Sequence, residues 1–159
     1  MGRRKNSRQL QKSVLIYTEG KTEKSYFLAL QRQYRRGRHL IIKSLAKQSI
    51  SLANEVERRL KKNCDVKRSE LEQVYVIFDK DDCSWEEIDK ALKKLRENNV
   101  RIGFSNESFE VWLLLHFKQA LSQPMLDRKN SYKQLSECLG INYKDAKGNS
   151  RTLWKRSPF

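Results

Sequence analysis

The sequence has few of the residues that would indicate a secreted, zinc-binding or membrane protein. Its three cysteines, Cys64, Cys83 and Cys138, are widely spaced and match neither a disulfide framework nor a zinc pattern. No apolar run approaches the length of a membrane span, and the charged N-terminus lacks the apolar segment of a secretory signal. We therefore expect a cytoplasmic protein with reduced thiols and no membrane partner.

Acidic residues are also scarce relative to basic ones. The 159-residue chain has 34 Lys and Arg against 19 Asp and Glu, a formal net charge of +15. This balance favours polyanionic partners, with nucleic acid ahead of an anionic membrane. We expect one domain over residues 13–142, preceded by a basic N-terminal arm at 1–12 and followed by a basic, truncated or disordered C-terminal tail at 143–159. The arm could follow phosphates along a nucleic acid or only increase solubility.

Strand-like and helix-like segments alternate along the first two thirds of the chain. Amphipathic helix patterns begin near Thr22, at Ser49 and after Ser84, where Glu87 completes a capping box. Residues 67–73 are polar and predict a loop. The predicted strands cover residues 14–17, 39–43, 74–78 and 100–104. This order predicts an α/β fold with a mostly parallel four-stranded sheet flanked by helices.

A second apolar segment, residues 105–117, begins with capping residues and is apolar almost all round, which predicts a buried helix. Within it, Glu110 needs a partner, and both a structural pair with Lys or Arg and a metal ion remain open. We interpret His116, one turn from Trp112, as a packed core histidine rather than a ligand. Further along, residues 131–139 predict a short helix that ends at Gly140.

Carboxylates follow two of the predicted strands. Asp79, Asp81 and Asp82 come directly after the apolar run 74–78, and Glu19 follows the first strand. If these strands are parallel neighbours, their acids meet at one edge of the sheet. Crowded carboxylates require a cation or shifted pKa values, and oxygen ligands without His or Cys suit Mg²⁺ or Mn²⁺. A solvated acidic turn is the simpler alternative, and Glu19 could act as a general acid or base instead of a ligand.

Three blocks in this order, VLIYTEGKTEKSYF, VYVIFDKDD and FSNESFEVWLLLHF, resemble the RloB-like proteins, a branch of the Toprim superfamily. The resemblance spans residues 13–117 and continues weakly to about 143. It implies a Toprim-like (Rossmann-like) fold in which Glu19, Asp79 and Asp81 are catalytic and hold Mg²⁺ (or Mn²⁺), with Asp82 as an additional ligand. The chain departs from the family at Glu107 and Ser108, where a Pro-containing turn is common, and in its short C-terminal segment.

The resemblance also implies a function. RloB-like proteins resemble the Toprim halves of ATPase–nuclease pairs such as the AbiLii-type phage-defence proteins. The expected function is therefore metal-dependent cleavage of DNA or RNA in bacterial abortive infection, with an AAA-type ATPase as partner. A non-catalytic nucleic-acid-binding subunit of such a system is the alternative. A receiver-like phosphoacceptor fits less well, because only Glu19 follows the first strand and no Lys directly follows Phe104.

Overall fold

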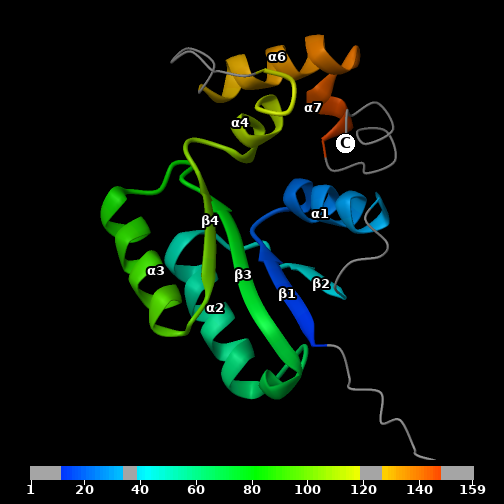
Figure 1. The fold of residues 1–159 in the computed structure, drawn as a ribbon. Coiled ribbons are helices and arrows are strands. Elements are labelled where there is room, and N and C mark those ends of the chain that lie inside the picture. Colours follow the sequence, from blue (N-terminus) through cyan, green and yellow to red (C-terminus); the bar gives the residue numbers. More distant parts are fainter. Residues whose placement is uncertain (1–11, 34–38, 119–126, 148–159) are drawn as a thin grey trace, which may run out of the picture.

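Four parallel strands form the centre of the fold in the computed structural model (Figure 1). They are β1 (Ser13–Thr18), β2 (Leu40–Ser44), β3 (Leu71–Asp79) and β4 (Arg101–Ser105), in the order β2-β1-β3-β4. Every neighbouring pair is parallel, so the predicted parallel α/β sheet is confirmed. The structure describes residues 12–33, 39–118 and 127–147, and the predicted arm up to residue 11 and tail from residue 148 lie outside them.

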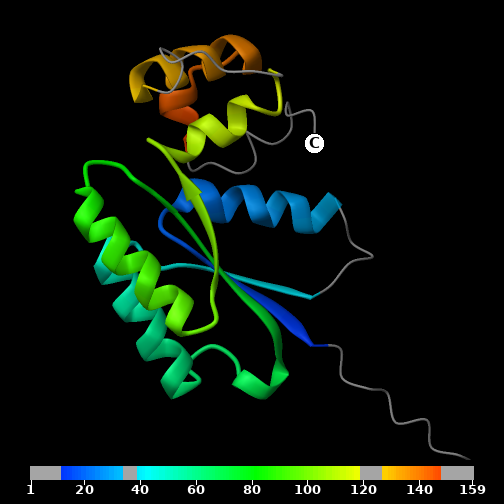
Figure 2. The ribbon, with the colours of Figure 1, turned by 60° about the vertical axis from the view of Figure 1, so that its left-hand side comes forward.

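Helices cover both faces of the sheet and its carboxyl edge. They are α1 (Lys21–Gln33), α2 (Ser49–Lys62), α3 (Trp85–Glu97), α4 (Phe109–Leu114), α6 (Arg128–Leu139) and α7 (Tyr143–Ala146). Helices α2 and α3 lie on one face and α1 on the other, while α4, α6 and α7 form a helical cap beyond the carboxyl ends of the strands (Figures 1 and 2). In the described ranges, no helix has both the length and the apolar character needed to cross a membrane.

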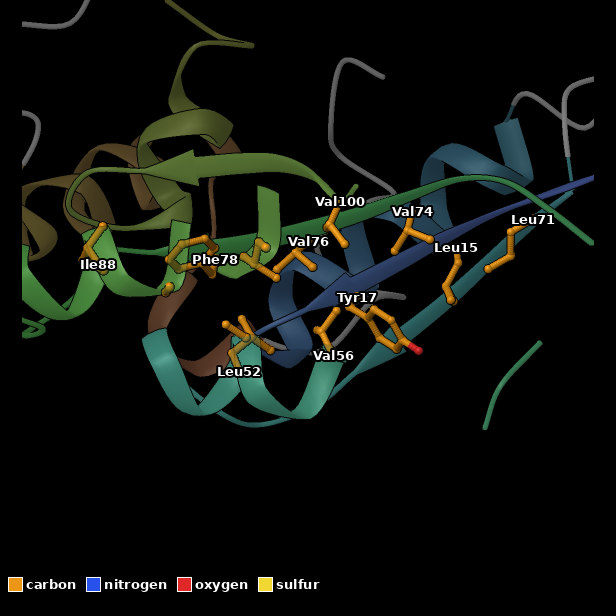
Figure 3. Packing of buried hydrophobic residues seen from close by; sticks show 13 residues of the cluster. Leu15, Tyr17, Leu52, Val56, Leu71, Val74, Val76, Phe78, Ile88 and Val100 are labelled. Carbon is orange, nitrogen blue, oxygen red and sulfur yellow. The ribbon is translucent and has the colours of Figure 1, made fainter. Parts of the chain in front are cut away.

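The two faces of the sheet bury alternate residues of each strand. Leu15 and Tyr17 of β1 belong to the large core between the sheet and helices α2 and α3 (Figure 3). Val14 and Ile16 point to the other face, where they pack near Phe27 of α1. Because side chains alternate along a strand, a continuous apolar run supplies both cores at once.

Local helix signals in the sequence are confirmed. Ser84 Oγ accepts a hydrogen bond from the backbone N–H of Glu87 at 3.2 Å, and Glu87 Oε2 accepts one from the Ser84 N–H at 3.1 Å. Helix α6 ends at Gly140 with φ 63°, the left-handed conformation that glycine adopts easily. These contacts involve residues close in sequence, and local pattern alone therefore predicts them.

Two expectations about residues 67–73 and 105–117 are wrong. Strand β3 begins at Leu71, whose side chain is buried, so the predicted loop is shorter. The apolar segment forms only a short helix, α4, and Trp112 and Leu115 are 45% and 46% exposed. Because α4 lies in the cap and not inside the sheet layers, only one side of it packs against the rest of the described protein.

The cap has an apolar core of its own. Leu114 of α4, Leu135 of α6 and Tyr143 of α7 are fully buried and belong to one cluster, which Tyr26 of α1 joins. Tyr143–Ala146 is therefore packed helix in a segment for which we expected a basic tail. The Tyr26 hydroxyl lies 3.1 Å from His116 Nε2, which supports a structural interpretation of that histidine.

We predict that the cap depends on Leu135. Leu135→Ala should lower the free energy of unfolding by about 2–5 kcal/mol, because it removes a fully buried side chain and leaves a cavity. Lys133→Ala on the exposed side of the same helix is the control and should change it by less than about 0.5 kcal/mol. Urea denaturation followed by circular dichroism measures both, and equal effects would contradict the prediction.

Candidate functional site

Glu19 and Asp79 meet at the carboxyl edge of the sheet. Glu19 directly follows β1, Asp79 ends β3, and these strands are parallel neighbours. The backbone N–H of Asp79 lies 3.4 Å from Glu19 Oε2, and the Glu19 N–H donates to the Ile77 carbonyl at 3.0 Å. After these residues the chain turns toward α1 on one face and α3 on the other (Figure 2). The acids therefore meet at one edge of the sheet, as we expected for parallel neighbours, and this edge is a topological switch point.

These acids line a cleft of about 350 Å³ between the sheet and the cap. The charged residues around it are Glu19, Glu23, Asp79, Asp81 and Glu110, with Lys21, Arg128 and Lys147. Sequence reasoning identified Glu19, Asp79 and Asp81 and left Glu110 open. It missed Glu23 as a lining residue and both cations from the cap. Asp82 is exposed and is not among the lining residues, because the chain turns between Lys80 and Cys83.

Both acids at the strand ends are buried, with exposed fractions of 8% for Glu19 and 7% for Asp79. Burial raises the pKa of Glu19 to about 7, and the charge of Asp81 adds to the rise. Burial also raises the pKa of Asp79 to about 8, with a further contribution from the charge of Glu23. Each carboxylate is thus harder to ionise because it loses water and faces like charges.

Gly20 allows α1 to begin next to the acids. Its backbone N–H donates to Glu23 Oε2 at 3.1 Å, and a Cβ atom at position 20 would lie 2.8 Å from that oxygen. The contact holds the Glu23 carboxylate at the start of the helix, inside the cleft. Burial raises the pKa of Glu23 as well. The sequence signal was a Glu in the first helical turn, which pointed to helix stability rather than to the site.

Asp81 lies in the cleft but already has partners. Arg128 Nη2 donates to its Oδ1, and Gln48 Nε2 donates to its Oδ2 at 3.3 Å. Its backbone has φ 44° and its N–H donates to the Glu107 carbonyl at 3.0 Å. Left-handed backbone is uncommon outside glycine and occurs more often for Asp, so this turn holds Asp81 in a defined position.

Glu110 forms the structural pair that was one of our two interpretations. Its side chain is 1% exposed, and its Oε1 accepts hydrogen bonds from the Tyr143 hydroxyl and from Lys147 Nζ, both at 2.9 Å. A buried carboxylate needs such partners. Both partners come from the segment that we expected to be a tail, which is why the sequence could not identify them.

Glu19 and Asp79 are the two carboxylates that could hold a hard divalent cation. Within residues 12–33, 39–118 and 127–147, no three His, Cys, Asp or Glu side chains are placed to hold a metal ion together. However, the Oδ1 atom of Asp79 is buried without a hydrogen-bond partner there, and Glu19 is adjacent. Mg²⁺ commonly binds through one or two carboxylates and completes its shell with water and substrate phosphates.

We predict a pH dependence of stability from the raised pKa values. In the unfolded chain these carboxyls ionise near pH 4, but in the folded chain they ionise near 7 and 8. Between those values the folded state binds more protons, so stability falls as pH rises. In EDTA, Asp79→Asn should therefore raise the free energy of unfolding by about 1–3 kcal/mol at pH 8.5 and by much less at pH 5.

Thermal denaturation at the two pH values measures this difference. Asp89→Asn, at an exposed position on α3, is the matched control and should have the same small effect at both. A stabilisation by Asp79→Asn that is equal at pH 5 and pH 8.5 would contradict a raised pKa.

Comparison with known proteins supports the resemblance in the sequence. The model of the family described as RloB-like protein matches residues 14–157, nearly the whole chain. No curated protein and no solved structure matches it significantly. The match includes both strand-end acids and the described part of the cap. The chain therefore belongs to the RloB-like protein family.

Proposed function

We propose that this protein is a metal-dependent nuclease that hydrolyses phosphodiester bonds of DNA or RNA in the cleft around Glu19 and Asp79. The observation that carries the proposal is the meeting of these two buried carboxylates at the switch point of a parallel sheet. Clusters of buried acids are costly for stability, and they are found where a site has a chemical task. The net charge of +15 supports a polyanionic substrate.

Glu19 and Asp79 would hold Mg²⁺ or Mn²⁺. When bound there, such an ion would polarise a phosphoryl oxygen and lower the pKa of a water molecule. Asp79 offers its unpartnered Oδ1, and Glu19 offers its Oε1, since its Oε2 accepts from the Asp79 N–H. Both carboxylates are buried, and the lower local dielectric strengthens their attraction for a cation.

Basic residues flank the cleft where a nucleic acid would enter. A groove of about 500 Å³ beside α1 is lined by Glu19 together with Lys21 and Lys24. A second groove, of about 540 Å³, is lined by Glu19 and Lys47. None of the three lysines has an ion-pair partner among the described residues. Phosphates on both sides of a scissile bond could thus contact lysines while the bond lies near the acids.

The first prediction of this proposal concerns cleavage. Glu19→Gln and Asp79→Asn should each lower Mg²⁺- or Mn²⁺-dependent cleavage of labelled DNA or RNA by at least about 100-fold, because each removes a charged ligand. Asp89→Asn, on the exposed side of α3, should keep wild-type activity. Cleavage at the wild-type rate by either cleft variant, with metal supplied, would rule out the assigned site.

The second prediction concerns binding. Replacing Lys21, Lys24 and Lys47 by Ala should weaken nucleic-acid binding and flatten the slope of log K against log salt by about 2–3. Fluorescence anisotropy across a salt series gives this slope.

The control makes the same charge change away from the cleft. Lys62, Lys67 and Lys93 are exposed and lie on or after α2 and on α3. The corresponding triple Ala variant should keep most of the salt slope. If both triple variants lose the same slope, the grooves beside Glu19 have no special role in binding.

A second candidate function, nucleic-acid binding without cleavage, is supported by the acids that already have ion-pair partners. Asp81 and Glu110 already pair with Arg128 and Lys147, as expected for a nucleic-acid-binding subunit that cannot cleave alone. In that case the purified chain would bind nucleic acid but would not cleave it, whichever divalent metal is supplied. The AAA-type ATPase partner implied by the resemblance would then be required for cleavage, and the role in phage defence would depend on that partner. Cleavage that appears only on adding the ATPase would favour this alternative.

A further inference from the structure

Arg128 is the first residue of α6 and reaches from the cap to the acidic turn after β3. Its guanidinium donates to Asp81 Oδ1, although the two residues are 47 positions apart in sequence. The side chains are partly accessible, with exposed fractions of 37% for Arg128 and 20% for Asp81. The contact therefore joins two separate layers of the fold, and both residues line the cleft.

The stability of α6 does not explain a cation at this position. A helix N-terminus carries a partial positive charge and favours acids. Asp127 already caps the helix, because its side chain accepts from the backbone N–H groups of Lys129 and Asn130. Arg128 adds positive charge at the N-terminus of α6, where the helix dipole disfavours a cation. Its interaction with Asp81 offsets this electrostatic cost. The contact of Arg128 with Asp81 in the cleft therefore explains why a cation stands at this end of α6.

The other cation that the cap supplies is held much more firmly. Lys147 contacts Glu110, which is 1% exposed and also accepts from the Tyr143 hydroxyl. Breaking that pair would leave a buried carboxylate without its cation, which is strongly unfavourable. Asp81 loses less when Arg128 leaves, because it is more accessible and keeps its contact with Gln48. Of the two pairs, only Arg128 and Asp81 can separate at low cost.

We propose that Arg128 exchanges partners during function: it pairs with Asp81 in the metal-free protein and binds a nucleic-acid phosphate when Asp81 turns to a divalent cation. This inference rests on the proposed nuclease function. The planar guanidinium suits the exchange, because it makes paired hydrogen bonds equally well with a carboxylate and with a phosphate. Arg128 acts here as a positioning residue, and the exchange couples metal binding to substrate binding.

The exchange predicts competition, which can be measured without nucleic acid. Calorimetric titration with Mn²⁺ should show about three- to tenfold tighter binding by Arg128→Gln than by the wild type, because Asp81 no longer pairs with a competing cation. Arg128→Lys should fall between them, since it keeps the charge and loses the fork. Lys129→Gln removes a neighbouring charge from the same helix end and should change the affinity by less than about twofold.

The role of Asp81 is tested by combining variants. In an Asp81→Asn background, Arg128→Gln should change the Mn²⁺ affinity by less than about twofold, because the competing pair no longer exists. An undiminished gain in this background would show that Arg128 acts through its general charge, which would overturn the exchange.

A second measurement tests the other partner. In Ca²⁺, which takes the same oxygen ligands, Arg128→Gln should weaken oligonucleotide binding by about tenfold. In EDTA, where Arg128 is paired with Asp81, the loss should be less than about threefold. A loss of equal size in both conditions would mean that Arg128 contacts phosphates regardless of metal and does not exchange.

These results separate the inference from the proposed function. A wild-type protein that binds Mn²⁺ and cleaves, with an Arg128→Gln variant of unchanged or weaker Mn²⁺ affinity, overturns only the exchange. A wild-type protein that binds no Mn²⁺ and cleaves nothing overturns both.

Discussion

The parallel pairing of β1 with β3 determines where the charges of this protein lie. It brings Glu19 and Asp79 to one edge of the sheet, and burial there raises the pKa of both carboxyl groups. A sheet with these strands apart would leave each acid in an ordinary solvated turn. The fold therefore buries carboxylates whose charged forms are unfavourable, and the surrounding elements have to offset that free-energy cost. A bound cation, a proton or a basic side chain can each reduce it.

The helical cap supplies the basic side chains. Arg128 and Lys147 reach the cleft from α6 and α7, and an apolar cluster around Leu135 and Tyr143 holds these helices together. The cap is thus more than a cover for the sheet. Its packing determines the positions of the cations, so a core substitution in α6 would alter the charge balance at a site that it does not touch.

Much of the fold could be predicted because its signals are local. The apolar runs predict the strands of the sheet, and Ser84 with Glu87 predicts the start of α3, since each pattern depends on residues close in sequence. The convergence of Glu19 and Asp79 was also predictable, because adjacent parallel strands end at the same edge. It required only the assumption that β1 and β3 are neighbours, which the strand order confirms.

The cations of the site could not be predicted in the same way. Among 34 Lys and Arg residues, neither Arg128 nor Lys147 has a local pattern that distinguishes it. Their positions depend on how α6 and α7 pack against α4, and that packing is long-range. The same reason applies to Tyr143, which reads as part of a polar segment but is fully buried in the cap. Where tertiary packing determines the environment of a residue, sequence periodicity does not predict its burial or its partners.

An acidic cleft in a strongly basic protein poses a problem for a phosphate substrate. The net charge of +15 attracts a polyanion to the molecule as a whole, but Glu19, Asp79 and Asp81 repel it over the last few ångströms whenever they are ionised. Ionic screening weakens the long-range attraction more than the short-range repulsion inside a buried cleft. Under the proposed function, a divalent cation between the carboxylates would reverse the local sign, so phosphate approach would become favourable only after the acids are neutralised. The lysines beside Glu19 would then contact a substrate that the cleft accepts, so in the proposed function metal would bind before the phosphate.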